Sequence, residues 1–169
     1  MADFADLADT VRSLEPGECA ELARAAAARI DASALSRSGT GSFELLWRND
    51  YSEAWLNTWW ESRDTGFHDH GGSCVGVHVI EGRAANEALT VGGPRRIDSY
   101  GPGESFAFRA DGIHRMDHDA GAVTVHVYSP PIASIGHYEL VGNELRRTAG
   151  PADEGSPPSP RLHEALGPA

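Results

Sequence analysis

Cysteine is scarce in this sequence, which excludes one class of small protein. Only Cys19 and Cys74 occur among 169 residues; Cys19 falls within a helical pattern, and Cys74 follows a pair of histidines. Small secreted domains that depend on disulfides carry many more cysteines in a short chain. The sequence therefore predicts no disulfide framework, and a reducing cytoplasm is the expected location.

Long apolar stretches and an export signal are also lacking. At no point do 18 apolar residues occur together, as a transmembrane helix would require. The N-terminus carries Asp3, Asp6 and Asp9 in place of a basic region followed by an apolar run. We expect a soluble protein that is not exported and has no membrane partner.

Positive charge is in short supply. Lys and Arg together number 14 against 25 Asp and Glu, which gives a formal net charge of −11. Nucleic acids and anionic membranes attract clustered Lys and Arg, whereas the basic residues here are scattered. The composition therefore excludes nucleic acid as an expected partner.

The length of the chain fits one domain, since single cores commonly form at roughly 100 to 200 residues. We predict one domain over residues 1–149, with a helical cap at 1–36. Residues 150–169 are rich in proline and predict a tail. No internal repeat is present, and we expect a monomer, with a weak homodimer as the alternative.

Two short helices are predicted at the start of the chain, over residues 4–14 and in a segment that begins at Pro16. Both carry apolar side chains at helical spacing: Phe4, Leu7, Val11 and Leu14 in the first, and Cys19, Leu22, Ala26 and Ile30 in the second. Such helices commonly cover the side of a sheet in small β domains. We therefore expect them to form a cap.

From Ser42 onward the pattern changes to short runs of alternating apolar residues. The runs are FELLWR, AWLNTWW, CVGVHVIEG, ANEALTV, RRIDSY, SFAFRA, IHRMDH, VTVHVYS and YELVGNELRRT. Turn sequences such as Gly92-Gly93-Pro94 and Gly101-Pro102-Gly103 separate them. Many short strands at nearly regular spacing predict a mainly β protein, either a sandwich or a small barrel.

His68 and His70 form the first candidate functional pattern, in the stretch TGFHDHGGSCVGVHVIEG. In a strand, residues i and i+2 point to one face, so the two imidazoles would project side by side, as metal ligands do. A pair of this kind also occurs by coincidence, because histidine is an ordinary partly buried residue. The pair alone leaves both interpretations open.

Glycines in both halves of the chain extend the pattern. Gly82 lies twelve residues after His70, and Gly103 precedes His114 by eleven. These spacings resemble the two motifs of the cupin superfamily, which are small double-stranded β-helix barrels. The resemblance implies two histidines and a glutamate from the first motif and one histidine from the second. Val75 occupies the glutamate position, so the implied ligands are His68, His70 and His114.

Three neutral imidazoles would leave a divalent ion with its full 2+ charge and about three open coordination positions. Such a centre suits a substrate and dioxygen, and we expect Fe(II). Zinc would tolerate the same ligands, and the ligand set alone does not decide between the two metals.

Three stretches resemble one cupin family in particular, the thiol dioxygenases typified by cysteine dioxygenase. They are HDHGGSCVGVHVIEG at 68–82, GIHRMDH at 112–118 and AVTVHVYSPP at 122–131. The resemblance implies an enzyme that oxidises a small carboxylated thiol, cysteine first, to its sulfinic acid with O2. The alternatives are 3-mercaptopropionate or another mercapto-acid as substrate, a metal cupin that binds or senses a ligand without turnover, and a zinc isomerase or hydrolase.

The family also implies roles for further residues. A Ser-x-His-x-Tyr strand flanks the iron in relatives, and here it corresponds to Thr124, His126 and Tyr128. Tyr128 would steer O2 and protons, with the other two positioning it. A cis peptide bond is expected before Pro130. Arg48, in LLWRND, corresponds to the residue that holds the substrate carboxylate; the alternative is an arginine in an ordinary salt bridge.

This chain departs from the family pattern near the first motif. Animal cysteine dioxygenases carry, at the position of Val75, a cysteine that crosslinks to the site tyrosine. Here the cysteine is Cys74, and one step in a strand reverses the face. We therefore expect no thioether to Tyr128. His78 and His118 are expected around the site or at the surface. The four tryptophans are expected in the core and at the rim of the barrel, and a platform for a cofactor is the alternative.

Overall fold

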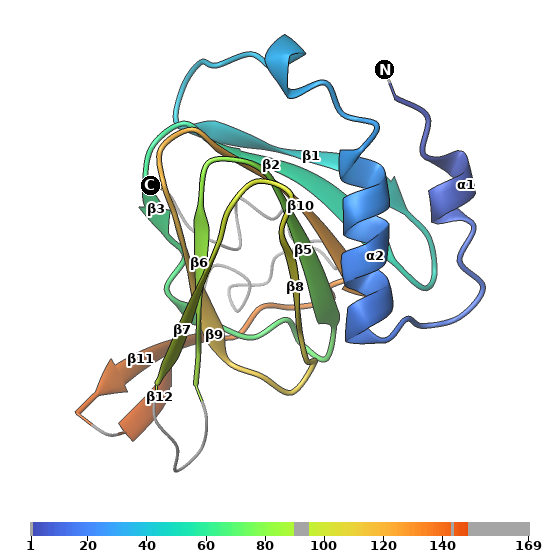
Figure 1. Ribbon diagram of the computed structural model, residues 1–169. Coiled ribbons are helices and arrows are strands. Elements are labelled where there is room, and N and C mark those ends of the chain that lie inside the picture. The colour runs from blue at the N-terminus through green and yellow to red at the C-terminus, as the bar shows by residue number, and fades with distance from the viewer. Residues whose placement is uncertain (1, 90–94, 143, 149–169) are drawn as a thin grey trace.

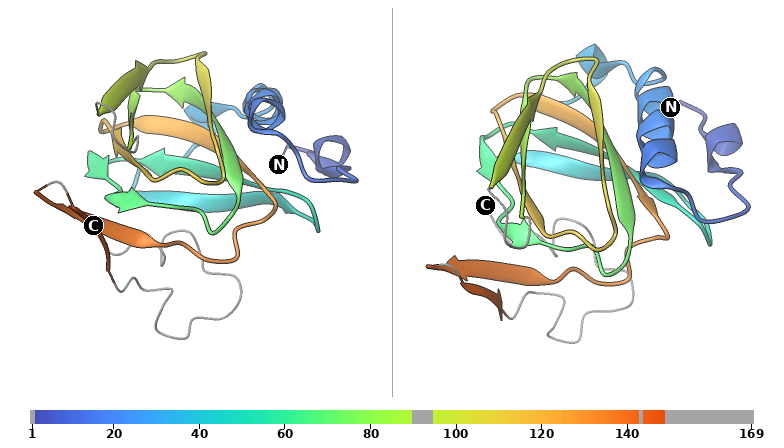
Figure 2. Two further views of the ribbon diagram at one scale, coloured as in Figure 1. Left: turned by 90° about the horizontal axis from the view of Figure 1, so that it is seen from below. Right: turned by 60° about the horizontal axis from the view of Figure 1, so that its bottom comes forward.

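The computed structural model describes residues 2–89, 95–142 and 144–148. These residues form a mainly β structure in which two antiparallel sheets wrap around a common interior (Figures 1 and 2). The expected fold class, a cupin double-stranded β-helix with short N-terminal helices, is confirmed. The predicted tail at 150–169 lies outside the described residues, and the domain boundary at 149 stays a prediction.

Two helices and a short 3-10 helix precede twelve strands. The helical elements are α1 (Ala5–Ala8), α2 (Pro16–Ala27) and η1 (Ala32–Ala34). The strands are β1 (Gly41–Arg48), β2 (Glu53–Trp59), β3 (Arg63–Asp64), β4 (Phe67–His68), β5 (Cys74–Glu81), β6 (Ala84–Ala88), β7 (Arg96–Tyr100), β8 (Ser105–Phe108), β9 (His114–His118), β10 (Ala122–Ser129), β11 (His137–Val141) and β12 (Glu144–Thr148). No helix among these has the length and apolar character needed to span a membrane.

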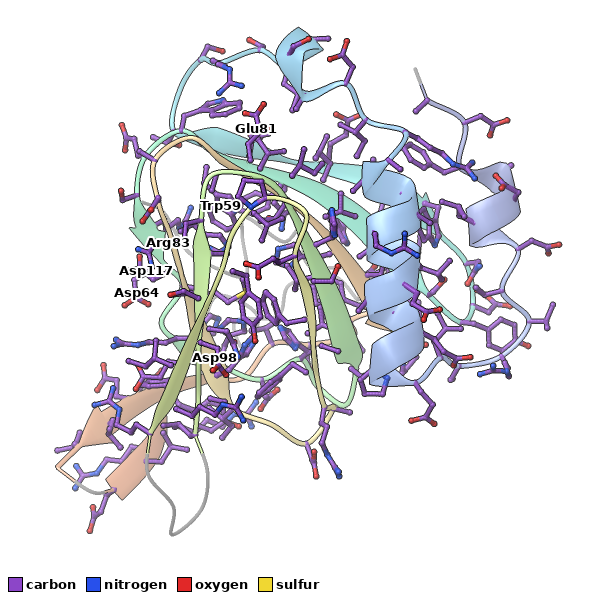
Figure 3. All side chains as sticks on the ribbon, in the orientation of Figure 1. Trp59, Asp64, Glu81, Arg83, Asp98 and Asp117 are labelled. Carbon is purple, nitrogen blue, oxygen red and sulfur yellow. The ribbon has the colours of Figure 1, made fainter. Side chains whose placement is uncertain are left out.

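One sheet has the strand order β1-β2-β10-β5-β8 and the other β12-β11-β4-β9-β6-β7, with β3 beside β9. Their inner faces enclose the interior, where Trp59 lies, while Asp64 and Asp117 are exposed (Figure 3). The hairpin of β11 and β12 extends away from the barrel (Figure 1). The interior between the sheets is therefore the place where chemically active side chains can be shielded from water.

Helix α2 has clear start signals in its sequence. Glu15 and Glu18 form a reciprocal capping box, and Pro16 occupies the first turn, where its missing N–H has no cost. The buried side of the helix packs against β5, β8 and β10 through small side chains, which are Cys19, Ala23, Ala26 and Ala27. The predicted second helix is thus present as a cap on the five-stranded sheet.

The first predicted helix is shorter than expected. The sequence favours a helix over 4–14, whereas α1 ends at Ala8. Asn49 Nδ2 donates to the Ala8 carbonyl and to Thr10 Oγ1, and the Leu14 N–H donates to Ser129 Oγ at 2.8 Å. Hydrogen bonds to distant segments thus replace those that would have continued the helix.

Strand β10 shows how alternation sets the two faces of the five-stranded sheet. Its valines, 123, 125 and 127, pack under α2, while Thr124, His126 and Tyr128 point inward. In the neighbouring β5 the inward positions are held by Val75 and Val77, which line the same cavity. The period of two therefore delivers three polar side chains to the interior from a single strand.

Candidate active site

His68, His70 and His114 meet in the interior. Each offers one ring nitrogen, and these three atoms all lie within 4.8 Å of one another. The two-residue strand β4 makes the cluster possible, because His68 pairs in register with His114 at the start of β9. The structure thus brings together all three histidines that were predicted as ligands.

The spacing of the ring nitrogens fits one metal ion. His70 Nε2 and His114 Nε2 are 3.4 Å apart. Two nitrogens each about 2.1 Å from one ion would be roughly 3.0 to 3.4 Å apart for octahedral or tetrahedral angles. The donor set therefore has the chemistry that a divalent ion requires, and the pair His70 and His114 also has the separation.

Two of the imidazoles are held by neighbours at Nδ1. His114 Nδ1 lies 2.6 Å from Asn86 Oδ1, and His68 Nδ1 lies 2.9 Å from the Gly66 carbonyl oxygen. Both partners accept, so each Nδ1 carries the proton and Nε2 presents its lone pair to the cavity. Phe108 also stacks on His114, with ring centroids 4.3 Å apart.

Burial keeps these imidazoles neutral. Desolvation is the main cause that lowers the pKa of His68 to about 4, and it holds the pKa of His70 and His114 well below the usual value. Neighbouring histidines lower the pKa of the last two further. Neutral imidazole is the form that binds a metal, so the cluster needs no deprotonation to act as a ligand set at neutral pH.

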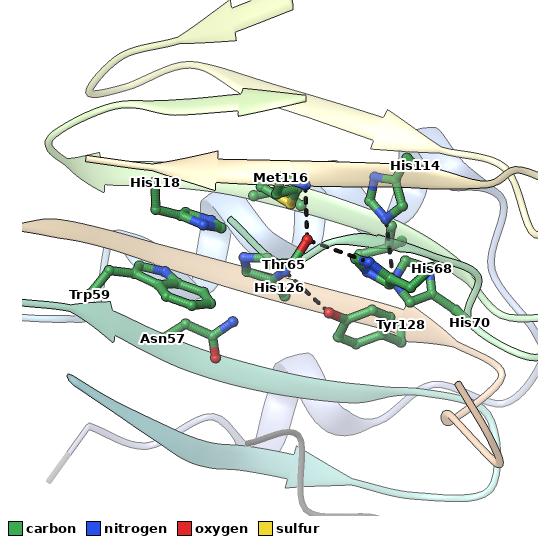
Figure 4. A pocket seen from close by; sticks show the side chains of 12 residues that line it. Asn57, Trp59, Thr65, His68, His70, His114, Met116, His118, His126 and Tyr128 are labelled. Carbon is green, nitrogen blue, oxygen red and sulfur yellow. Dashed lines mark hydrogen bonds between the residues drawn. The ribbon is translucent and has the colours of Figure 1, made fainter. Parts of the chain in front are cut away.

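A small cavity adjoins the cluster. The space in it open to the centre of a water molecule is about 20 Å³, which is enough for about one water. The histidine cluster and Tyr128 line one part, and the rest is lined mainly by Asn57, Trp59, Thr65, Met116, His118 and His126 (Figure 4). The site is therefore small, largely enclosed and dense in imidazole.

Tyr128 is the inner end of a hydrogen-bonded series on β10. Its hydroxyl lies 3.2 Å from His126 Nδ1, and His126 Nε2 lies 3.0 Å from Thr124 Oγ1. Trp59 Nε1 donates to Thr124 Oγ1 at 3.2 Å. The three predicted residues thus form one connected series, which ends at a tryptophan that the sequence did not implicate.

The series faces the histidine cluster. The rings of Tyr128 and His70 have centroids 5.1 Å apart, so the phenol adjoins the cluster (Figure 4). Burial, followed by the negative charge of Glu53, raises the pKa of Tyr128, while burial lowers the pKa of His126 to about 3. At neutral pH the phenol is therefore protonated and the imidazole is neutral.

Arg48 lies near the site but does not line the cavity. A β-bulge between Leu45 and Trp47 turns Arg48 to the same face as Glu53, its partner in β2. Arg48 Nε lies 3.4 Å from Glu53 Oε2, and its guanidinium donates to the Ile132 carbonyl at 3.3 Å. Of the two interpretations of Arg48, the structure therefore shows the salt bridge directly.

Cys74 and Val75, within the first motif, point to opposite faces of β5, as strand alternation predicts. Val75 pairs in register with Tyr128, whereas Cys74 pairs with Ser129 and points the other way. The Cys74 sulfur lies 3.7 Å from that of Cys19, under α2. The Ser129–Pro130 peptide bond is cis, which confirms that prediction.

Two other histidines have different surroundings. His118 is fully buried, lines the cavity and stacks on Trp59 with ring centroids 3.9 Å apart. His78 lies on the opposite face of β5 and bonds through Nδ1 to Ser105 Oγ at 2.7 Å. Of these two histidines, only His118 lines the cavity.

Several lining residues escaped prediction from the sequence. Asn86 and Thr65 contact the histidine cluster, while Asn57 and Trp59 line the cavity from β2. Asn57 could have been found from the sequence, because it lies two residues before Trp59 in a strand and therefore points to the same face. Asn86 depends on the pairing of β6 with β9, for which the sequence offered no signal.

Comparison with known proteins gives a family and a set of distant structural likenesses. The model of the family described as cysteine dioxygenase type I matches residues 40–140, more than half of the chain. This range contains all seven residues predicted for the site. No curated protein matches the sequence.

Three solved structures resemble the fold at low identity. A protein of Bacillus halodurans is 16% identical, with a TM-score of 0.49, over 56% of this chain and 74% of its own. A double-stranded β-helix protein of Klebsiella pneumoniae is 14% identical, with a TM-score of 0.49, over 63% of this chain and 92% of its own. A variant of Bacillus subtilis oxalate decarboxylase is 16% identical, with a TM-score of 0.48, over 54% of this chain but only 26% of its own length.

Proposed function

Because the chain belongs to the cysteine dioxygenase type I family, we propose that it is a mononuclear Fe(II) thiol dioxygenase. Its substrate would be a small carboxylated thiol, cysteine first, and its product the sulfinic acid. The observation that carries the proposal is the cluster of three buried, neutral imidazoles beside Tyr128. We place the enzyme in the reducing cytoplasm, because the substrate must arrive as a free thiol. We also propose that it is a monomer.

His68, His70 and His114 would hold the iron, and each is fixed by packing or by hydrogen bonds before the ion arrives. When bound, ferrous iron would deprotonate a coordinated thiol and hold the thiolate and O2 next to each other. The reaction balances without another reductant: RSH and O2 give RSO2H, both oxygen atoms ending on sulfur. The protein therefore has to orient the reactants, control one proton and exclude excess water.

The hydrogen bonds from Trp59 to Tyr128 can run in only one direction, and this direction determines where the hydroxyl hydrogen of Tyr128 points. The indole N–H can only donate, so Thr124 Oγ1 accepts from it and directs its own hydrogen to His126 Nε2. His126 is neutral, so its single proton is then on Nδ1 and is donated to the phenol oxygen. The Tyr128 O–H remains available to donate into the cavity.

Tyr128 would use this hydrogen on the reacting oxygen atoms. Its raised pKa keeps the phenol protonated, so it can stabilise negative charge as it develops without giving up its proton. The small size of the cavity leaves little space for water that would compete for this hydrogen bond. Tyr128 is therefore the catalytic residue, and His126 and Thr124 act through it as positioning residues.

Arg48 is our candidate for the substrate carboxylate. A guanidinium can form two parallel hydrogen bonds to a carboxylate. In the structure this side chain is partly committed to Glu53 and Ile132. Binding of a carboxylate would therefore add to, or exchange with, contacts that are already present.

The test is oxygen consumption by protein loaded anaerobically with iron. Cysteine, 3-mercaptopropionate, mercaptosuccinate and cysteamine are supplied separately, and sulfinate is followed by mass spectrometry. We expect uptake of one O2 for each sulfinate formed from a carboxylated thiol, and loss of most of this activity in Tyr128→Phe with its iron retained. Iron-loaded protein that binds thiols but consumes no O2 with any of them would support a ligand-binding cupin instead.

A further inference from the structure

The two cysteines of the chain meet between helix α2 and strand β5. Cys19 and Cys74 are 55 residues apart in the sequence, yet their sulfur atoms lie 3.7 Å apart, and both are free thiols. The sulfur atoms of a disulfide are about 2.05 Å apart, so a bond between these two requires an approach of roughly 1.7 Å. The pair is therefore placed to form a bond that the reduced protein does not contain.

The elements that carry the two thiols are already in close contact. A Cβ atom at Gly76 of β5 would lie 2.2 Å from the Cys19 carbonyl carbon, so the backbones of helix and strand touch at this point. The remaining approach of the sulfur atoms needs rotation of the two side chains rather than movement of α2. A disulfide here would join two elements without separating them from their present packing.

Only one of the two thiols is open to solvent. Cys74 is 5% exposed and Cys19 is 0% exposed. Cys74 lines an open pocket at the N-terminal end of α2, in which the space open to the centre of a water molecule is about 410 Å³. The apolar part of the lining consists of Leu14, Pro16, Ala110 and Pro130. A small molecule can therefore reach Cys74, whereas Cys19 lies behind it.

The hydrogen bonds of the pair distinguish the roles of the two thiols. The Cys74 S–H donates to the Leu14 carbonyl at 3.3 Å. A thiol has one hydrogen, so the Cys19 S–H is the one that donates to the Cys74 sulfur. This bond is the main cause that lowers the pKa of Cys74, against the effect of burial, and it raises the pKa of Cys19. Because thiolate is the nucleophile in thiol–disulfide exchange, Cys74 is the attacking thiol of the pair.

The charged groups around the pocket narrow the class of ligand. Glu15 and Asp111 line it, and Arg109, the basic residue of the lining, forms an ion pair with Asp111. The negative charge of Glu15 also opposes ionisation of Cys74. An attacking disulfide that carries carboxylates would be repelled here, and one that carries ammonium groups would be attracted. The pocket therefore suits a small disulfide without negative charge.

We propose that Cys74 is a thiol–disulfide exchange site for small disulfides without negative charge, with Cys19 as its resolving thiol. The Cys74 thiolate attacks one sulfur of RSSR, which forms a mixed disulfide and releases RSH with the proton of Cys74. The Cys19 sulfur then attacks the Cys74 sulfur and releases the second RSH with its own proton. In total, two protein thiols and RSSR give one protein disulfide and two RSH, so the protein is oxidised and the small disulfide is reduced. This activity goes beyond the proposed function, because it uses neither O2 nor the histidine cluster.

The test exposes the reduced protein to cystamine without O2 and follows the intact mass. We expect the unaltered protein to lose two hydrogen atoms without a lasting adduct, and peptide mapping to find a bond between Cys19 and Cys74. Cys19→Ala should stop at an adduct of one cysteamine on Cys74, and Cys74→Ala should not react. A reaction of Cys74→Ala as fast as that of the unaltered protein would overturn the proposal. So would an unaltered protein that reacts only after unfolding in urea, a result that depends on neither variant.

The charge of the disulfide tests the class of ligand. Cystamine carries ammonium groups and dithiodipropionate carries carboxylates, and each rate is divided by that of the protein unfolded in urea, which removes the difference in their intrinsic reactivity. We expect the folded protein to favour cystamine by about 5-fold or more. Glu15→Gln keeps an oxygen for the helix cap and should reduce this preference, whereas Glu21→Gln, exposed on α2 outside the pocket, should keep it. Equal corrected rates for the two disulfides in the unaltered protein would overturn the assignment of the ligand class.

Discussion

Asn86 decides which nitrogen of His114 is presented to the cavity. Its side-chain oxygen accepts from His114 Nδ1, which leaves Nε2 as the ligand atom. Residues that orient a metal-binding histidine commonly contribute 10- to 100-fold to metal affinity. We therefore expect Asn86→Ala to weaken Fe(II) binding by about 10- to 100-fold, measured by competition with a chelator under anaerobic conditions.

Two further variants calibrate that result. His114→Ala should lose most of the bound iron because a ligand is removed, and His78→Ala should keep it because His78 lies on the other face of β5. The expectation for Asn86 fails if its variant binds iron as tightly as His78→Ala.

Thr124 is the residue that gives the series its direction. In Thr124→Val the shape is nearly kept, but Trp59 Nε1 and His126 Nε2 both lose their partner. His126 can then hold its proton on either nitrogen, and Tyr128 is no longer held as a donor toward the cavity. We expect kcat/KM to fall by about 10- to 100-fold at unchanged iron content, read from oxygen uptake and metal analysis.

Thr58→Val is the matched control for this substitution. Thr58 is also buried on the five-stranded sheet, but its hydroxyl contacts Ser42, outside the cavity. An equal loss of activity in the two valine variants would contradict a directional role for Thr124.

The sequence predicted which residues meet in the interior better than it predicted the residues that hold them in place. Motif spacing brought His68, His70 and His114 together correctly, and the period of two placed Thr124, His126 and Tyr128 on one inner face. Asn86 was missed because its contact depends on the register between β6 and β9. Such a register is decided by the packing of the whole sheet.

At the scale of elements, the close contact of α2 with β5 depends on one glycine. A Cβ atom at Gly76 would lie 2.0 Å from the Ala20 backbone nitrogen and 2.2 Å from the Cys19 carbonyl carbon. Backbone atoms at this distance cannot move aside without shifting the helix. We expect Gly76→Ala to lower the free energy of unfolding by about 1 to 3 kcal/mol or more, measured by urea denaturation.

The control lies within the helix itself. A Cβ at Gly17 would meet no atom within 4 Å, so Gly17→Ala should be neutral or stabilise by up to about 1 kcal/mol. If Gly76→Ala were as stable as the unaltered protein, α2 would not pack closely on β5.

The predicted and observed elements differ where a strand is very short or irregular. The presence of the main strands followed from their alternation, but β3 and β4 have only two residues each, too few to show any period. The bulge between Leu45 and Trp47 left no trace in the sequence, yet it decides that Arg48 faces Glu53. Elements shorter than a period, and irregularities within strands, depend on tertiary contacts.

At the scale of the whole molecule, the site joins the two sheets and fills the interior with imidazole. His68 and His114 come from one sheet, and His126 from the other. Burial lowers the pKa of the five histidines that line the interior cavity, which are His68, His70, His114, His118 and His126. The stability of the metal-free fold should therefore depend on pH.

The free energy of unfolding should fall as the pH falls, because the unfolded chain binds more protons than the folded one. Above pH 6.5 these histidines are neutral in both states, whereas below it they are protonated only in the unfolded chain, so acid favours unfolding. With its pKa lowered to about 4, His68 alone should lower the free energy of unfolding by about 1.5 kcal/mol between pH 6.5 and 5. Urea denaturation of chelator-treated protein across this pH range measures the summed effect of all the buried histidines on the free energy of unfolding.

One variant isolates a single contribution to this pH dependence. His118 contributes no hydrogen bond to the described residues through either ring nitrogen, and it stacks on Trp59. His118→Phe keeps an aromatic ring and removes one protonation site, so its stability should fall less steeply between pH 6.5 and 5. An identical slope would show that His118 is not held neutral in the folded protein.

The placement of Cys74 has a consequence for self-protection. For the proposed function, the protein's own thiol groups have to be kept from being oxidised at the site and from binding the metal permanently. Cys74 adjoins Val75, whose side chain lines the cavity, yet alternation directs its sulfur to the far side of the sheet, beside that of Cys19. The backbone of β5 thus separates the cavity, where the proposed thiol substrate would react, from the protein's own two thiols.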